Sequence, residues 1–140
     1  MDVKRIRAAA NWNATAEALS GRDCDVRFEQ PSRQGVDGLF WRLNDTAVIQ
    51  LSPDIPEDQL MRVFLHEAAH ALHDFDRYTI HRSERPARAA KPYTKNHLQR
   101  PVVSRSETRA ERQAREWLAA CDGCSSLMGK HIALMILAHS

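Results

Sequence analysis

The strongest constraint on the fold of this chain is the run from Leu60 to Asp76, which contains the motif His66-Glu67-Ala-Ala-His70 and neither Gly nor Pro. On a helix, residues four apart lie one turn above each other on the same face. His66 and His70 can therefore bind one metal ion, and Glu67 can reach a water on that ion. Two His ligands and a Glu general base in this H-E-x-x-H spacing are typical of zinc hydrolases. The apolar flanks of the motif favour a buried helix.

The length and composition are those of a single soluble domain. A chain of 140 residues is long enough for one core, and 43% apolar with 27% charged residues is ordinary for a globular protein. No apolar run approaches the length of a membrane span, and the first residues have no apolar segment typical of a secretory signal. Three cysteines are too few for a disulfide scaffold. We therefore expect a cytoplasmic protein with no membrane partner, organised as one domain over residues 1–140.

The residues before the motif predict a helix and a small sheet. An apolar stripe predicts a helix over residues 2–20, stopped by Gly21, with Trp12 as a core anchor. Alternating or apolar runs predict strands over residues 24–29, 38–43 and 47–51, the last two joined by a tight turn at Asn44-Asp45. We expect these strands to form a small antiparallel three-stranded sheet, and Pro56 to open the motif helix.

Two helices are predicted near the C-terminal end of the sequence. Ser104 and Glu107 fit a capping box that starts a helix over residues 104–121, in which Glu107 and Glu111 share a face. Ser125 or Ser126 caps a last helix over residues 127–138 that is apolar almost all round. Such a helix should be buried, either in this core or against a second copy of the chain in a homodimer. The predicted fold class is α+β.

A long basic segment, residues 77–103, separates the motif helix from the helix that follows. It contains three prolines and almost no apolar periodicity. Residues 77–105 include eight basic residues and one acidic residue. The bases are Arg77, Arg82, Arg85, Arg88, Lys91, Lys95, Arg100 and Arg105. Loops of this length are often functional, so the segment is interpreted either as a solvated insertion or as a lid, a substrate-docking surface or a nucleic-acid contact.

A catalytic zinc ion keeps three protein ligands, so one more is needed besides the two histidines. Asp76 lies six residues after His70, where some zinc peptidases place a third ligand, but residue 73 is His rather than the Gly that would turn the chain. The helix over residues 104–121 offers Glu107 and Glu111 on one face instead. Glu116 points the opposite way around the helix from Glu111.

A family resemblance bears on the choice between these two glutamates. The sequence HEAAHALHDF, followed by Glu111-Arg-Gln-Ala-Arg-Glu-Trp-Leu-Ala, resembles the ImmA/IrrE-type zinc metallopeptidases over about residues 36–120. In that family a small sheet and an H-E-x-x-H helix precede a helix of form E-x-E-A-N-x-F-A. Glu111, Ala114 and Trp117 match the first Glu, the Ala and the aromatic residue. The resemblance implies a minimal zincin-like, gluzincin-like domain with zinc ligands His66, His70 and Glu111.

The sequence departs from this pattern at Gln113 and Arg115, and the basic segment makes the gap between the two helices longer than usual. The second helix also resembles the metallopeptidase domain of ArdC-type antirestriction proteins, whose E-L-V-A-E pattern matches Glu107 to Glu111. That alignment makes Glu107 the second choice as ligand, or else a carboxylate that orients a histidine.

Two functions follow from these resemblances. The first is a zinc endopeptidase in which Glu67 takes a proton from the zinc-bound water and passes it to the leaving amine of a protein partner, for the resembling family commonly a helix-turn-helix repressor of a phage or mobile element. The second is a nucleic-acid-associated antirestriction module that uses the basic segment, with the metal site accessory or structural. Oxyanion stabilisation in the first would come from one of four residues of that segment: Tyr78, His81, Tyr93 or His97.

Overall fold

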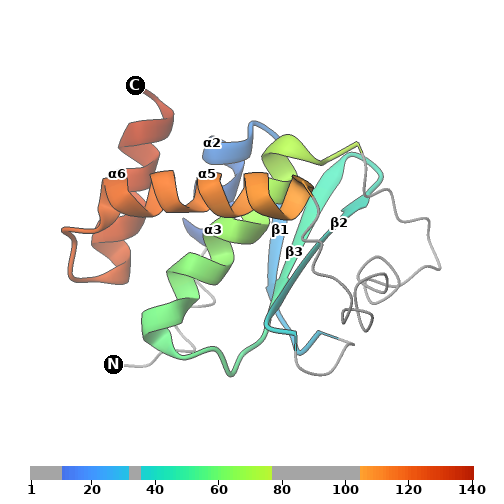
Figure 1. The fold of residues 1–140 in the computed structure, drawn as a ribbon, viewed down its shortest axis with the longest axis horizontal. Coiled ribbons are helices and arrows are strands. Elements are labelled where there is room, and N and C mark those ends of the chain that lie inside the picture. Colours follow the sequence, from blue (N-terminus) through green and yellow to red (C-terminus); the bar gives the residue numbers. More distant parts are fainter. Residues whose placement is uncertain (1–10, 32–35, 77–104) are drawn as a thin grey trace.

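Four helices and one three-stranded sheet form the described part of the computed structural model, residues 11–31, 36–76 and 105–140 (Figure 1). The elements are α2 (Asn11–Ser20), β1 (Asp23–Phe28), β2 (Gly38–Leu43), β3 (Thr46–Leu51), α3 (Glu57–His73), α5 (Arg105–Cys121) and α6 (Leu127–Ala138). This is the predicted α+β class. The first half of the predicted N-terminal helix, Ser104 of the predicted capping box and the basic segment 77–103 lie outside the described residues.

The sheet is mixed, so the prediction of an antiparallel sheet is wrong for one of its two pairings. The strand order is β1-β3-β2, with β2 antiparallel and β1 parallel to β3. The β2–β3 hairpin turns at Asn44-Asp45 as predicted, and Asn44 adopts a left-handed φ of 57° that Asn tolerates. β3 is buried along almost its whole length and takes the centre. Period-two patterning predicts strands but carries no information about the direction of the partner strand.

Helix α3 lies at the centre of the fold (Figure 1), and α2 packs beside it against β1. It packs against β2 and β3 on one side and against α2 and α5 on the others. Its apolar side chains Leu60, Phe64 and Leu65 are completely buried, and Trp12 of α2 packs edge-on against Phe64 as the expected core anchor. This burial fixes the rotation of α3 about its axis, and with it the direction in which the two motif histidines point.

The last helix, α6, has the predicted bounds, and Ser126 caps it by accepting a hydrogen bond from the backbone N–H of Gly129 at 3.0 Å. One face, with Leu127, His131 and Leu134, is buried. On the other face Met128, Ile132 and Ile136 are more than half exposed. Within the single chain, therefore, only one face of this helix is buried. That a second copy of the chain covers the other face in a homodimer stays a prediction. None of the described helices is long and apolar enough to cross a membrane.

Candidate metal centre

The two motif histidines lie side by side on α3, as their spacing predicts. The ring centroids of His66 and His70 are 4.9 Å apart, with their planes at 77°. His70 is almost fully buried and lies parallel to the ring of Phe40 on β2, at 6.2 Å between centroids. Packing from the sheet therefore restricts one of the two imidazoles, while His66 lies nearer the surface.

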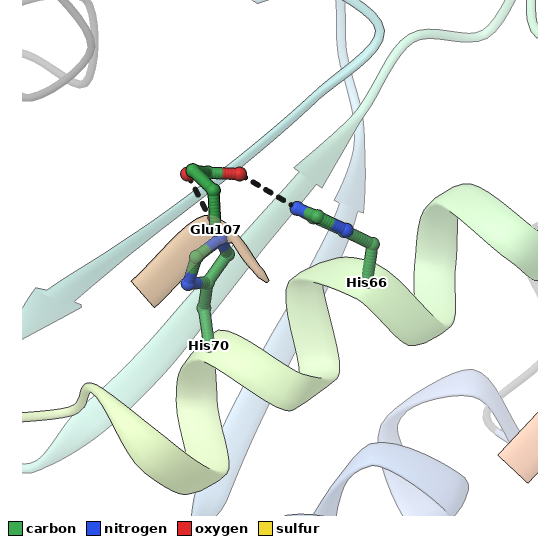
Figure 2. A group of neighbouring side chains, drawn as sticks. All are labelled: His66, His70 and Glu107. Carbon is green, nitrogen blue, oxygen red and sulfur yellow. Dashed lines mark hydrogen bonds and ion pairs between the residues drawn. The ribbon is translucent and has the colours of Figure 1, made fainter. Parts of the chain in front are cut away.

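Glu107 of α5 faces both histidines, as Figure 2 shows. Its Oε1 lies 2.9 Å from Nε2 of His66, and its Oε2 lies 3.2 Å from Nε2 of His70. Donor atoms of these three residues all lie within 4.8 Å of one another, and among the described residues this is the one such group. Helix α3 thus supplies two imidazole nitrogens, and helix α5, more than 35 positions later in the chain, supplies a carboxylate close to both.

The other ring nitrogens of the two histidines each meet a different carboxylate. Nδ1 of His66 lies 2.9 Å from Oε1 of Glu111, and Nδ1 of His70 lies 3.0 Å from Oδ2 of Asp74. A carboxylate at Nδ1 accepts the N–H there and leaves Nε2 as the nitrogen available to a metal. Both rings are therefore oriented alike, with Nε2 toward Glu107 and Nδ1 away from it.

The sequence favoured Glu111 as the third ligand, with Glu107 as the second choice, and the structure places the two glutamates differently around the histidines. Glu107, the second choice, lies between the Nε2 atoms, whereas Glu111 lies at the outer nitrogen of His66. The alternative ligand Asp76 is not near the histidines: it is exposed and pairs with Arg42 at 3.0 Å. His73 is likewise away from the group and contacts Gln113. The geometry thus groups His66, His70 and Glu107.

The donor set suits a divalent ion such as zinc. Zinc takes imidazole nitrogen and carboxylate oxygen at about 2.0–2.2 Å, which puts tetrahedral ligand atoms about 3.3 Å apart. The observed separations of 2.9 and 3.2 Å between Glu107 and the two Nε2 atoms are close to that value. These three residues could therefore hold a divalent ion.

Glu67, the predicted general base, is buried beside this group and against the start of β2. Its side chain approaches Gly38 so closely that a Cβ added there would lie 3.1 Å from its Cγ and 3.2 Å from its Oε2. Burial raises the pKa of Glu67, and the charges of His70 and His66 offset part of that shift.

The charges around the histidines favour their protonated forms in the absence of an ion. Burial acts to lower the pKa of His66, but the hydrogen bond with Glu107 and the charges of Glu67 and Glu107 outweigh it and raise the pKa to about 9. The pKa of His70 is raised against its burial in the same way, with Asp74 contributing. Burial acts to raise the pKa of Glu107, yet hydrogen bonds from both imidazoles hold it well below its usual range.

Sequence reasoning missed two residues next to this group, Asp74 and Arg109. Asp74 hydrogen-bonds His70 and pairs with Arg109 of α5 at 2.5 Å. The spacing of four between His70 and Asp74 on one helix is a signal that was available in the sequence. The expected oxyanion-stabilising residues Tyr78, His81, Tyr93 and His97 all lie outside the described residues.

Among the residues that the structure describes, the cysteines do not belong to a second group that could hold a metal ion. Cys24 and Cys121 are buried free thiols, and Cys124 is a partly buried free thiol. Burial raises the pKa of Cys24 to about 11, which keeps it protonated.

Comparisons of the chain with protein-family models, with curated proteins and with solved structures find no match.

Proposed function

We propose that this chain is a zinc-dependent peptidase in which His66, His70 and Glu107 bind the ion and Glu67 is the general base. The observation that carries the proposal is the position of Glu107, which α5 brings against Nε2 of both motif histidines (Figure 2). An H-E-x-x-H helix completed by a carboxylate from a later helix has the ligands and the base of a zinc hydrolase. A purely structural site would have no use for Glu67 beside its ligands.

His66, His70 and Glu107 would hold the zinc ion, which when bound would supply Lewis-acid chemistry: a water with a pKa of roughly 7 and a polarised carbonyl. The residues of this chain supply the proton transfers and the orientation. Glu67 accepts the proton of the attacking water and returns it to the amine that leaves the cleaved peptide bond. Asp74 and Glu111 accept hydrogen bonds at Nδ1 of the two histidines and keep both Nε2 atoms facing Glu107.

The proposed substrate is a protein partner rather than a small amide. The resemblance to ImmA/IrrE-type peptidases makes a helix-turn-helix repressor the first candidate to assay. A cytoplasmic setting is part of the proposal, because all three cysteines are free thiols and two of them are buried.

The test is hydrolysis of candidate repressors by the full chain, with bound zinc measured in the same preparations. Glu67→Gln should bind zinc like the wild type and lose about 10²- to 10⁴-fold in hydrolysis, the usual contribution of a positioned acid–base group. Glu57→Gln is the matched control, because it makes the same charge change at an exposed position of the same helix. A Glu67→Gln variant that hydrolyses like the wild type, or a wild type that binds no zinc, contradicts the proposal.

A further inference from the structure

Asp74 is a buried carboxylate in a position that its own helix disfavours. It follows the last residue of α3 and is 1% exposed, and its backbone N–H closes the helix by donating to the carbonyl of His70 at 2.7 Å. The C-terminal end of a helix carries partial negative charge, which repels an anion. A buried charge also costs several kcal/mol unless it is paired and hydrogen-bonded. Local helix preference therefore does not explain an aspartate at this place.

The two oxygens of Asp74 have separate partners. Oδ2 accepts from Nδ1 of His70 at 3.0 Å, and Oδ1 accepts from Nη2 of Arg109 at 2.5 Å. The first contact defines which nitrogen of His70 carries the proton and so which one faces the metal position. The second contact ties the end of α3 to α5, the helix that carries Glu107.

The ion pair between Arg109 and Asp74 affects which glutamate of α5 lies next to the histidines. Arg109 is two residues after Glu107, and Glu111 is one helical turn, about 5.4 Å, beyond Glu107 on the same face. A shift of α5 along its own axis by about one turn would bring Glu111 toward the Nε2 atoms in place of Glu107. The contact between Arg109 and Asp74 opposes that shift, since the two groups would separate.

We propose that Asp74 and Arg109 are a positioning pair: Asp74 orients His70 for metal binding, and Arg109 holds α5 at the register that places Glu107 between the histidines. This inference rests on the proposed metal site. It assigns to the pair a role in metal affinity and ligand geometry, beyond the stabilisation that any buried ion pair gives.

The experiment compares zinc affinity in Asp74→Asn and Asp76→Asn, measured on the full chain by competition with a chromophoric chelator. Asp76 is the matched control, because it is two residues away, loses the same charge and forms an exposed ion pair with Arg42. Loss of a carboxylate partner of a metal-binding histidine lowers metal affinity about 10- to 100-fold. We expect that loss in Asp74→Asn and zinc affinity like that of the wild type in Asp76→Asn.

The absorption spectrum of bound Co²⁺ separates positioning from stability, because it reports the ligands and their geometry. We expect the spectrum of Asp74→Asn to differ from that of the wild type, and that of Asp76→Asn to match it. Arg109→Met should weaken zinc binding, with Arg109→Lys recovering part of the loss. Arg112→Met, an exposed arginine of the same helix, should have no effect.

Equal zinc affinity and equal Co²⁺ spectra in wild type and Asp74→Asn overturn the inference, whatever the melting temperatures, and leave the proposed metal site standing. If Asp74→Asn does not fold, Arg109→Met is judged by the same criterion. A wild-type chain that binds neither Zn²⁺ nor Co²⁺ contradicts the proposed function itself, so the two failures are distinct.

Discussion

Two histidine environments, one between α3 and α5 and one between α2 and α6, have opposite electrostatics. At the end formed by α3 and α5, three carboxylates contact His66 and His70 and raise their pKa values. At the end formed by α2 and α6, His131 lies against the rings of Trp12 and Phe64 and contacts the hydroxyl of Thr15 at 2.7 Å. Burial lowers the pKa of His131 to about 4.

The comparison shows that burial alone makes a histidine neutral, and that paired carboxylates reverse the effect. It also separates function from packing. A buried histidine with aromatic neighbours is a core residue, whereas two histidines that share a carboxylate form a site that can exchange protons for a metal ion. Three of the four predictions that follow test this contrast and one tests the position of Glu67, in order from the largest expected effect to the smallest.

The largest difference is expected in metal binding. His70→Ala should lower zinc affinity by more than about 100-fold, because it removes a ligand rather than a partner of a ligand, for which 100-fold is the upper end. His131→Asn should bind zinc like the wild type, although it disturbs an equally buried histidine. Equilibrium dialysis with Zn²⁺ measures both. Equal affinities in the two variants would remove the distinction between the two environments.

The second difference is expected in acid stability. His131 titrates at about 4 in the folded chain and near 6.5 when unfolded, so the unfolded chain binds more protons between these values. The free energy of unfolding should therefore fall as the pH drops from about 6.5 to 4, by up to about 3 kcal/mol from this group.

Urea unfolding of the metal-free chain at several pH values measures that fall. In His131→Gln the part due to His131 should be missing, so the stability of the variant should depend less on pH across this window. Parallel pH profiles for wild type and variant would show that His131 is not held neutral by burial.

A smaller effect is expected from the close approach of β2 to the general base. A methyl group at residue 38 would lie 2.9 Å from Cγ1 of Val63 and 3.1 Å from Cγ of Glu67, so one of them must move. Gly38→Ala should reduce kcat/KM on the order of tenfold through displacement of Glu67, with zinc affinity nearly unchanged. Gly123→Ala is the control, since nothing lies within 4 Å of its added Cβ. If zinc affinity fell as much as hydrolysis, the substitution would have displaced the metal ligands rather than Glu67.

The smallest effect is a proton count. With the pKa of His66 at about 9, this ring is protonated at pH 7.5, and a metal ion must displace the proton from Nε2. Zinc binding at pH 7.5 should release at least about one proton per ion, and zinc affinity should fall as the pH is lowered. Calorimetry in two buffers with different ionisation enthalpies gives the count. Release of no proton would show that the histidines are already neutral in the metal-free chain.

The sequence was sufficient for features that depend on local pattern. The bounds of α6, its Ser126 cap, the turn at Asn44-Asp45 and the burial of Trp12 all follow from residues close together in the chain. The common face of His66 and His70 follows from helix geometry in the same way.

The features that the sequence did not predict depend on how elements meet. Whether β1 runs parallel or antiparallel to β3 depends on the path of the chain between β1 and β2, which alternation does not encode. Glu107 and Glu111 share a face of α5. Which of them lies at the Nε2 atoms therefore depends on how far α5 is shifted along its own axis relative to α3. In the structure that shift is marked by the contact between Arg109 and Asp74, two residues that no periodic pattern connects.

The most direct test of the metal centre is a comparison of zinc affinity in Glu107→Gln and Glu111→Gln. Both variants change a carboxylate to an amide on the same face of the same helix, one turn apart. Glu107→Gln should lose more than about 100-fold in affinity as a ligand, and Glu111→Gln about 10- to 100-fold as a partner of His66. A larger loss in Glu111→Gln than in Glu107→Gln would contradict the assignment of His66, His70 and Glu107 as the metal ligands.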